Sequence, residues 1–281
     1  MSYSLKQLRN GTWTIHSETE NECFHPGMGP VAEARALYVE QQKLVKRLRV
    51  AEQEMVIWDV GLGSGANVLT FLRDVEMVEG EVRIESFDQT LEPLGFASSE
   101  GAKLGFVNGY EDAVQRLLKE GDVCFKNGQC EVRWKVHVGD FPNLLKSDHS
   151  LPSPDAILFD AFSPKKNPSM WTLPLFRRLK DACCDERPCS ISTYSRSTMI
   201  RVSWLMAGFY VGAGRATGVQ EETTVASTSL QLLNEPLGAD WLERVKISDN
   251  AEPLIEPVYE QKGIQASSWE ALLNHPQFTS R

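Results

Sequence analysis

Short apolar runs alternate with amphipathic segments along most of the chain. Runs such as 156–159 are typical of strands buried on both faces of a parallel sheet. After residue 65, Val68, Leu69, Phe71 and Leu72 recur with helical spacing. The pattern therefore predicts an α/β fold. The expected elements are a strand–helix–strand unit at 55–88, strands at 131–138, 155–160, 189–194, 208–215 and 223–231, and helices at 31–49, 91–104, 109–120, 173–184, 196–207 and 269–273. A hairpin is expected over Asn127 and Gly128.

A glycine-rich turn joins the first expected strand to its helix. Gly61, Gly63 and Gly65 alternate with other residues directly after the apolar segment 56–60. Glycine lets bare backbone approach a ligand because no Cβ stands in the way. The third glycine comes one residue earlier than in the dinucleotide fingerprint G-x-G-x-x-G, and no P-loop lysine follows. The turn favours a cofactor other than a nucleoside triphosphate, and its alternative is a turn without a ligand.

Acidic residues stand at the ends of the next strands. Asp88 follows 82–87, where a carboxylate can accept hydrogen bonds from both ribose hydroxyls of a nucleoside. Gly139 and Asp140 follow a later strand and would place a carboxylate beside an adenine amino group. A strand-end Asp can instead cap the next helix. Several successive strand ends with Gly or Asp nevertheless favour one ligand site at the carboxyl edge of the sheet.

The loop after strand 155–160 carries groups that suit a small polar ligand. It begins at Asp160, and Pro164 and Pro168 restrict its backbone. A carboxylate, an amide and apolar walls predict a pocket, formed by Asp160, Phe162, Asn167, Met170 and Trp171. The alternative is an ordinary proline-rich loop, in which Trp171 packs in the core and Asn167 bonds within the loop.

Together these motifs resemble the class I S-adenosylmethionine-dependent methyltransferases. The segment from Asp160 to Thr172 is more specific, because it is similar to the pattern D-x-F-[AS]-P-x-K-N-P-x-M-W-[ST] of the methyltransferase domain of the tRNA-modifying MnmC family. The turn from Gly61 to Asn67 resembles the family's G-x-G-x-G-x-N. The resemblance covers roughly residues 22–230 and includes an N-terminal segment with Phe24, His25, Pro26, Gly29 and Glu33.

The resemblance implies a Rossmann-like fold with a seven-stranded, mostly parallel sheet, an antiparallel closing hairpin and helices on both faces. It implies S-adenosylmethionine as cofactor and methylation of an aminomethyl group, that of 5-aminomethyl-(2-thio)uridine at the wobble position of tRNA. Asp160 would be catalytic, because a carboxylate can take the ammonium proton. The expected cofactor-binding residues are Glu33, Gly61, Gly63, Gly65, Asn67, Asp88, Gly139 and Asp140. The expected substrate-binding residues are Phe162, Lys165, Lys166, Asn167, Met170, Trp171 and Arg178.

The charge of the chain argues against its expected RNA partner. The net charge is −9, whereas nucleic-acid binding draws much of its affinity from Lys and Arg. Residues 218–224 also contain two acids where the family tends to carry basic residues. A local patch would draw on Lys165, Lys166, Arg177, Arg178, Arg196, Arg201 and Arg215. A small-molecule amine is therefore an alternative substrate, and a non-catalytic S-adenosylmethionine-binding role is another; the glycine spacing disfavours a nicotinamide-dependent reductase.

Composition also bears on location and domain organisation. No apolar run is long enough for a transmembrane helix, and the N-terminus lacks the apolar core of a signal peptide. The six cysteines form no C-x-x-C motif, so we expect free thiols, no metal site and a cytoplasmic protein. We expect a methyltransferase domain with its N-terminal extension at 1–235 and a C-terminal extension at 236–281. The larger family members contain a flavin-dependent oxidoreductase module, but no second glycine fingerprint lies after residue 100, so we do not expect that module in this chain. The sequence does not predict an oligomeric state.

Overall fold

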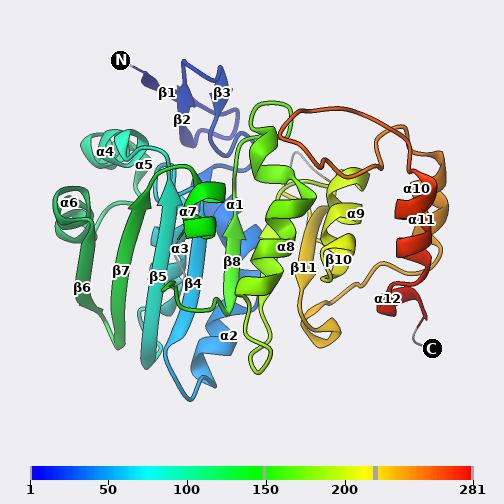
Figure 1. Cartoon of the computed structure of the whole chain (residues 1–281). Coiled ribbons are helices and arrows are strands. Elements are labelled where there is room, and N and C mark those ends of the chain that lie inside the picture. Colours follow the sequence, from blue (N-terminus) through cyan, green and yellow to red (C-terminus); the bar gives the residue numbers. More distant parts are fainter. Residues whose placement is uncertain (1, 148–149, 218–220, 280–281) are drawn as a thin grey trace.

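The computed structural model describes residues 2–147, 150–217 and 221–279, which form an open α/β sheet and a small antiparallel sheet (Figure 1). The strands are β1 (Tyr3–Gln7), β2 (Trp13–Ser17), β3 (Glu22–Cys23), β4 (Met55–Val60), β5 (Gly80–Asp88), β6 (Asp122–Asn127), β7 (Cys130–Val138), β8 (Ala156–Phe159), β9 (Ser190–Thr193), β10 (Tyr210–Gly214) and β11 (Thr223–Ser227). The α-helices are α1 (Pro30–Ala34), α2 (Leu44–Arg49), α3 (Ala66–Val75), α4 (Glu92–Ser99), α5 (Gly101–Leu104), α6 (Glu111–Glu120), α7 (Phe141–Ser147), α8 (Leu173–Ala182), α9 (Thr198–Met206), α10 (Trp241–Ile247), α11 (Ala266–Leu273) and α12 (Pro276–Thr279). A π-helix, η1 (Arg35–Glu40), follows α1, and the 3₁₀ turns are η2 (Pro168–Trp171) and η3 (Leu230–Leu232).

The large sheet is parallel in its centre and antiparallel at both edges. Within the described chain, its strand order is β10-β11-β9-β8-β4-β5-β7-β6. The neighbours from β9 to β7 pair in parallel, whereas β10, β11 and β6 pair antiparallel. The chain runs from β4 outward through β5 and β7, then returns to β8 on the other side of β4. This reversal leaves a crevice at the carboxyl ends of β4 and β8, where open α/β sheets bind ligands.

Alternating side chains of the central strands fill two hydrophobic layers. In β4, Met55 and Ile57 belong to the layer that contains α3 and α6. Val56, Trp58 and Val60 belong to the opposite layer, with α8 and α9. Successive strand residues point to opposite faces, so a continuous apolar run such as β4 requires cover on both sides. The expected α/β fold with helices on both faces is confirmed.

Two local expectations differ from the structure. The sheet has eight strands in the described chain rather than seven, because the hairpin after Asn127 adds β6 at the edge, with Asn127 opposite Cys130. The segment 31–49 is not one continuous helix. It changes to the π-helix η1 and is then interrupted at Lys43, whose left-handed backbone (φ 55°) cannot continue a right-handed helix.

Both terminal regions pack on the large sheet. Figure 1 shows β1–β3 above the carboxyl ends of β5 and β8, and α10–α12 beyond α9. The side chain of Gln277 bonds the backbone N–H and C=O of Val211, and Leu173 donates its N–H to Leu254. These contacts join the C-terminal residues to β10 and to the start of α8. In the described part of the chain, no helix has the length and apolar character needed to span a membrane.

Candidate active site

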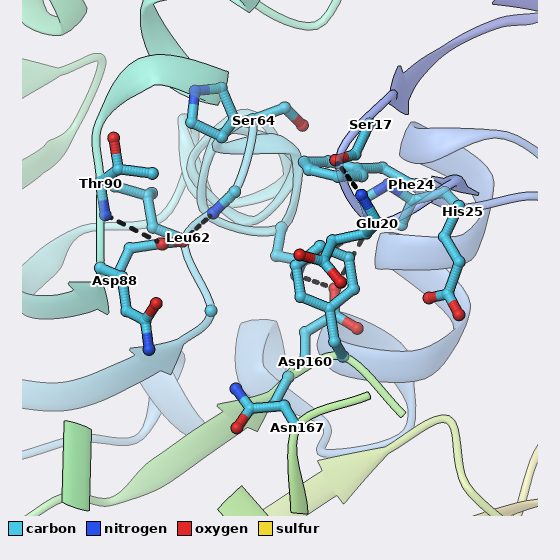
Figure 2. A pocket seen from close by; sticks show the side chains of 18 of the residues that line it. Ser17, Glu20, Phe24, His25, Leu62, Ser64, Asp88, Thr90, Asp160 and Asn167 are labelled. Carbon is cyan, nitrogen blue, oxygen red and sulfur yellow. Dashed lines mark hydrogen bonds and ion pairs between the residues drawn. The ribbon is translucent and has the colours of Figure 1, made fainter. Parts of the chain in front are cut away.

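A cavity of about 470 Å³ lies at the carboxyl ends of β4, β5 and β8, within the size range of small-molecule sites. The glycine turn, Asp88 and the loop after Asp160 form its walls, and residues from the N-terminal sheet complete it. In Figure 2, Asp88 and Thr90 lie on one side of the view, and Phe24 and Glu20 on the other. The cavity therefore sits where the strand-end motifs meet.

The glycine turn packs closely against other parts of the protein. Gly61 has φ 93°, and a Cβ at this position would lie 2.6 Å from the carbonyl oxygen of Asp160. Gly63 has φ 51°, and its Cβ would lie 3.2 Å from the ring of Phe24. Gly61 and Gly63 line the cavity, whereas Gly65 is not among the lining residues. Glycine is thus required here by the close approach of protein atoms, independently of any ligand.

Asp88 faces the cavity from the end of β5. Its carboxylate accepts hydrogen bonds from the N–H groups of Gly63 (2.8 Å) and Thr90 (3.3 Å). Burial raises the pKa of Asp88, although these backbone bonds oppose the shift. Gly139 also lines the cavity, but Asp140 does not. The backbone carbonyl oxygen of Asp140 accepts hydrogen bonds from the N–H groups of Asn143 and Leu144 in the first turn of α7.

Asp160 is held by side chains from two distant segments. Asn67, on α3, donates its amide to Asp160 Oδ2 at 2.8 Å. The imidazole of His25, between β3 and α1, places Nε2 3.5 Å from the same oxygen. Burial favours the neutral acid, but the bonds from His25 and Asn67 and the charge of His25 outweigh it and lower the pKa of Asp160. Asp160 is therefore a partly buried carboxylate, with a side chain 21% exposed, whose neighbours favour its charged form.

His25 belongs to this cluster, although no chemical role was predicted for it. Its Nε2 also lies 3.3 Å from Asn67 Oδ1, and its Nδ1 is buried without a hydrogen-bond partner in the described structure. Burial opposes a charge on His25, yet the nearby carboxylates of Asp160 and Glu33 raise its pKa. Its place in the segment that resembles the MnmC family was the one available signal, because nothing local links residue 25 to residue 160.

The predicted substrate residues divide into three groups. Phe162, Asn167 and Met170 line the cavity, and the ring of Phe162 meets that of Phe24 edge to face, with centroids 5.9 Å apart. Trp171 is fully buried outside the cavity and donates its indole N–H to the carbonyl of Phe162. Lys165, Lys166 and Arg178 are exposed and lie outside the lining, and Lys166 Nζ donates to the carbonyl of Glu20 at 3.0 Å.

The described lining of the cavity is strongly acidic. It contains no Lys or Arg, but six carboxylates: Glu20, Glu22, Glu33, Asp88, Glu92 and Asp160. Such an arrangement attracts cations and repels phosphate. The cavity lining, like the chain as a whole, therefore has more acidic than basic residues.

Arg201 was a candidate cation for RNA, and the structure contradicts that expectation. It is only 1% exposed and bonds Thr224, Thr223 and Glu222 beneath the surface. Arg196 and Arg215 are exposed but pair with Glu221 and Glu40. Residues 218–220 lie outside the described residues.

Comparisons with known proteins agree with the predicted family resemblance. Residues 108–229 match the family model described as S-adenosyl-L-methionine-dependent methyltransferase. The chain is 24% identical over 249 residues to the tRNA 5-methylaminomethyl-2-thiouridine biosynthesis bifunctional protein MnmC of Leptospira interrogans, covering 84% of this chain and 37% of the relative. The protein of the same description from Vibrio cholerae is 25% identical over 240 residues, covering 78% and 34%. The chain thus spans about a third of the length of these relatives.

The fold is similar to that of a solved protein. The crystal structure of MnmC2 from Aquifex aeolicus superposes with a TM-score of 0.71 at 24% identity, covering 98% of this chain and 84% of that chain. The lining fits S-adenosylmethionine in its chemistry, because Asp88 presents a carboxylate to the cavity and the other acids would suit the positive charge of a sulfonium and an ammonium. The chain thus contains a region that matches the S-adenosyl-L-methionine-dependent methyltransferase family, and over most of its length it is similar to MnmC proteins.

Proposed function

We propose that this chain methylates the amino nitrogen of an aminomethyl group, and that 5-aminomethyl-(2-thio)uridine at the wobble position of tRNA carries that group. One observation carries the proposal: Asp160 is a charged carboxylate at an acidic cavity that contains no Lys or Arg in its described lining. Such a cavity suits a protonated amine. The tRNA part is supported by the similarity to proteins named for 5-methylaminomethyl-2-thiouridine biosynthesis, and a tRNA substrate implies a cytoplasmic protein.

The cofactor would lie along the glycine turn, with its ribose at Asp88. When bound, S-adenosylmethionine supplies a methyl group activated by a positively charged sulfur. Gly63 and Thr90 use only part of the hydrogen-bonding capacity of Asp88, which leaves acceptor positions for ribose hydroxyls. Glu33 faces the same cavity and offers a carboxylate to a cationic group. Gly65 would act indirectly, by allowing the turn to pack on Leu94.

Asp160 would act on the incoming amine. A protonated amine has no lone pair, so one proton must leave before the nitrogen can attack, and Asp160 is positioned to take it. Asn67 fixes the carboxylate, while alignment of the nitrogen with the methyl group supplies much of the rate. Phe162, Asn167 and Met170 would hold the base, with Phe162 providing a face for stacking. Trp171 would support the backbone of Phe162 from behind.

A small-molecule amine is the second candidate substrate. It is favoured by the acidic cavity and by the net charge of −9, both of which oppose a polyanion. Under the tRNA proposal, phosphate contacts must lie outside the cavity, where Lys165, Lys166 and Arg178 are exposed.

Methyl transfer from radiolabelled S-adenosylmethionine decides between the two substrates. The protein is assayed with tRNA that carries the unmethylated aminomethyl group, and in parallel with free primary amines. Transfer to tRNA alone supports the proposal, whereas transfer to amines with none to tRNA replaces the substrate. No transfer to either, with S-adenosylhomocysteine bound in calorimetry, would leave a non-catalytic cofactor-binding protein.

Asp160→Asn tests the catalytic assignment. The amide is nearly isosteric but cannot take a proton, so activity should fall about 100-fold or more while S-adenosylhomocysteine still binds. Asp181→Asn, an exposed position on α8, is the matched control and should keep full activity. Near-normal turnover of Asp160→Asn would show that the carboxylate is structural.

A further inference from the structure

The position of His25 is not explained by packing alone. The residue lies between β3 and α1, whereas Asp160 follows β8 and Asn67 lies on α3. Its Nε2 is 3.5 Å from Asp160 Oδ2 and 3.3 Å from Asn67 Oδ1, so one ring nitrogen faces both side chains. The side chains of these three residues therefore meet in one cluster in the wall of the cavity.

The backbone and the second ring nitrogen of His25 are both unfavourably placed. His25 has φ 53°, a left-handed conformation that residues other than glycine rarely adopt. The side chain is only 8% exposed, and its Nδ1 is buried without a hydrogen-bond partner in the described structure. Residues held in such conformations cluster at functional sites, where the surrounding structure maintains them.

The charged and titratable groups around the imidazole are acids and tyrosines. Asp160 faces it from the loop after β8, and Glu33 from α1. Tyr38 on η1 and Tyr194 after β9 lie near Asp160, and burial together with the charge of this carboxylate raises the pKa of both phenols. Tyr194 donates its hydroxyl to the carbonyl of Ala161 at 2.9 Å. With no Lys or Arg in the described lining, His25 is the cation that these acids can bring into the cluster.

We propose that His25 holds the proton that Asp160 takes from the substrate amine. This inference rests on the proposed function. His25 would act on the substrate only through Asp160, so it is a positioning residue. When the proton moves on to His25, the carboxylate of Asp160 returns to its charged form.

The N–H bond of the substrate ammonium breaks, its proton passes to Asp160 and then to neutral His25, and the nitrogen keeps the electron pair. That pair forms the N–C bond to the methyl group, while the methyl–sulfur bond breaks with its electrons left on sulfur. His25 afterwards releases the proton to water. The acceptor state is therefore neutral His25 beside ionised Asp160.

The pH dependence of methyl transfer separates this role from simple packing. Acids around His25 raise its pKa above the ordinary 6.5, so activity of the unaltered protein should fall as pH drops through that raised value. His25→Asn suits the left-handed backbone, because Asn tolerates φ > 0, and should keep cofactor binding. At pH 8 it should lose activity on the order of 10-fold or more, and the acid limb due to His25 should disappear.

His16→Gln is the matched control. His16 also faces an acid, Glu18 at 3.8 Å, but it is not among the residues that line the cavity. This variant should keep both the rate and the pH profile of the unaltered protein. Calorimetry with S-adenosylhomocysteine checks that each variant is folded. An unchanged acid limb in folded His25→Asn, or the same loss in His16→Gln, overturns the proposal.

A titration followed by NMR keeps the inference testable apart from turnover. The chain has five histidines, and the resonance missing from His25→Asn identifies His25. It should titrate above the ordinary histidine pKa, and Asp160→Asn should lower that value. A His25 that titrates normally, or does not respond to Asp160→Asn, contradicts the pairing even in an active enzyme. If the unaltered protein methylates neither tRNA nor amines, the proposed function fails and the transfer role fails with it, while the NMR result still decides the pairing.

Discussion

Replacing Gly61 with Ala tests whether the glycine turn and Asp160 form one rigid unit. Gly61 directly follows β4, and its new Cβ would lie 2.6 Å from the carbonyl oxygen and 2.9 Å from the carbonyl carbon of Asp160. Both neighbours are backbone atoms, so neither can rotate away as a side chain would. The substitution must move either the turn or the residue proposed as catalytic.

The loss of stability has two parts that a control can separate. Placing a Cβ in the left-handed conformation at φ 93° costs about 1–2 kcal/mol. Overpacking against fixed atoms adds about 1–3 kcal/mol, giving a total of roughly 2–5 kcal/mol. Gly121, at the end of α6, has φ 82° and nothing within 4 Å of its Cβ position. Gly121→Ala should therefore show only the first part.

Urea unfolding of the two variants measures the difference. Gly61→Ala should be less stable than Gly121→Ala by about 1–3 kcal/mol. Its methyl transfer should also fall by at least about 10-fold in the folded protein, because small displacements of catalytic groups are costly. Equal stability losses at the two glycines would refute the argument from close approach. Normal activity in Gly61→Ala would separate the turn from the function of Asp160.

Three further outcomes follow from the charges. Lys165→Glu combined with Arg178→Glu should weaken tRNA binding and reduce its salt dependence without changing S-adenosylhomocysteine binding. Filter binding at several salt concentrations measures the affinity for tRNA, and calorimetry measures the binding of S-adenosylhomocysteine. Unchanged tRNA affinity would show that the RNA binds elsewhere. Arg201→Met should destabilise folding by about 3–5 kcal/mol, because it leaves the partners of a buried guanidinium unpaired, and equal urea midpoints would contradict this. Glu85→Gln should cost about 2 kcal/mol at pH 7, since bonds from His137 and Arg83 lower the pKa of Glu85 despite burial. That stabilisation is present above the unfolded-state value near 4.5 and is lost as pH falls through the lowered folded value, so the two proteins should converge in urea unfolding at acid pH.

Local patterns predicted most of the fold. The run before Gly61 is apolar at nearly every position, which only a strand covered on both faces requires, and β4 lies at the centre of the sheet. The turn residue Gly128 likewise indicated the hairpin between β6 and β7. The π-helical stretch and the left-handed Lys43 were not predictable, because no glycine or proline marks the interruption.

The candidate site was predictable only where it depends on strand ends. Asp88 is the last residue of β5 and Asp160 directly follows β8, so parallel pairing brings them to one edge. The contact of His25 with Asp160 depends on how the N-terminal sheet packs over that edge, which no local pattern specifies. The opposite error concerned Arg201: a cationic residue looks exposed in a sequence, but here threonines and a glutamate bury it.

An acidic cavity and a polyanionic substrate impose opposite electrostatic demands, and distance reconciles them. Screening limits interactions through solvent to a range of about 8 Å at physiological salt, so phosphates that lie farther than this from the cavity acids experience little repulsion from them. The proposed entering group is an ammonium, which Asp160, Glu33 and the other lining acids favour. Under the tRNA proposal, phosphates would remain outside the cavity, where Lys165 and Arg178 are exposed. Under the tRNA proposal, the acids select a base that carries an amine over one that does not, while the outer cations contribute affinity. A small amine as substrate needs only the acids of the cavity and not the outer cations. Charge reversal at Lys165 and Arg178 therefore distinguishes the tRNA substrate from the small-amine substrate.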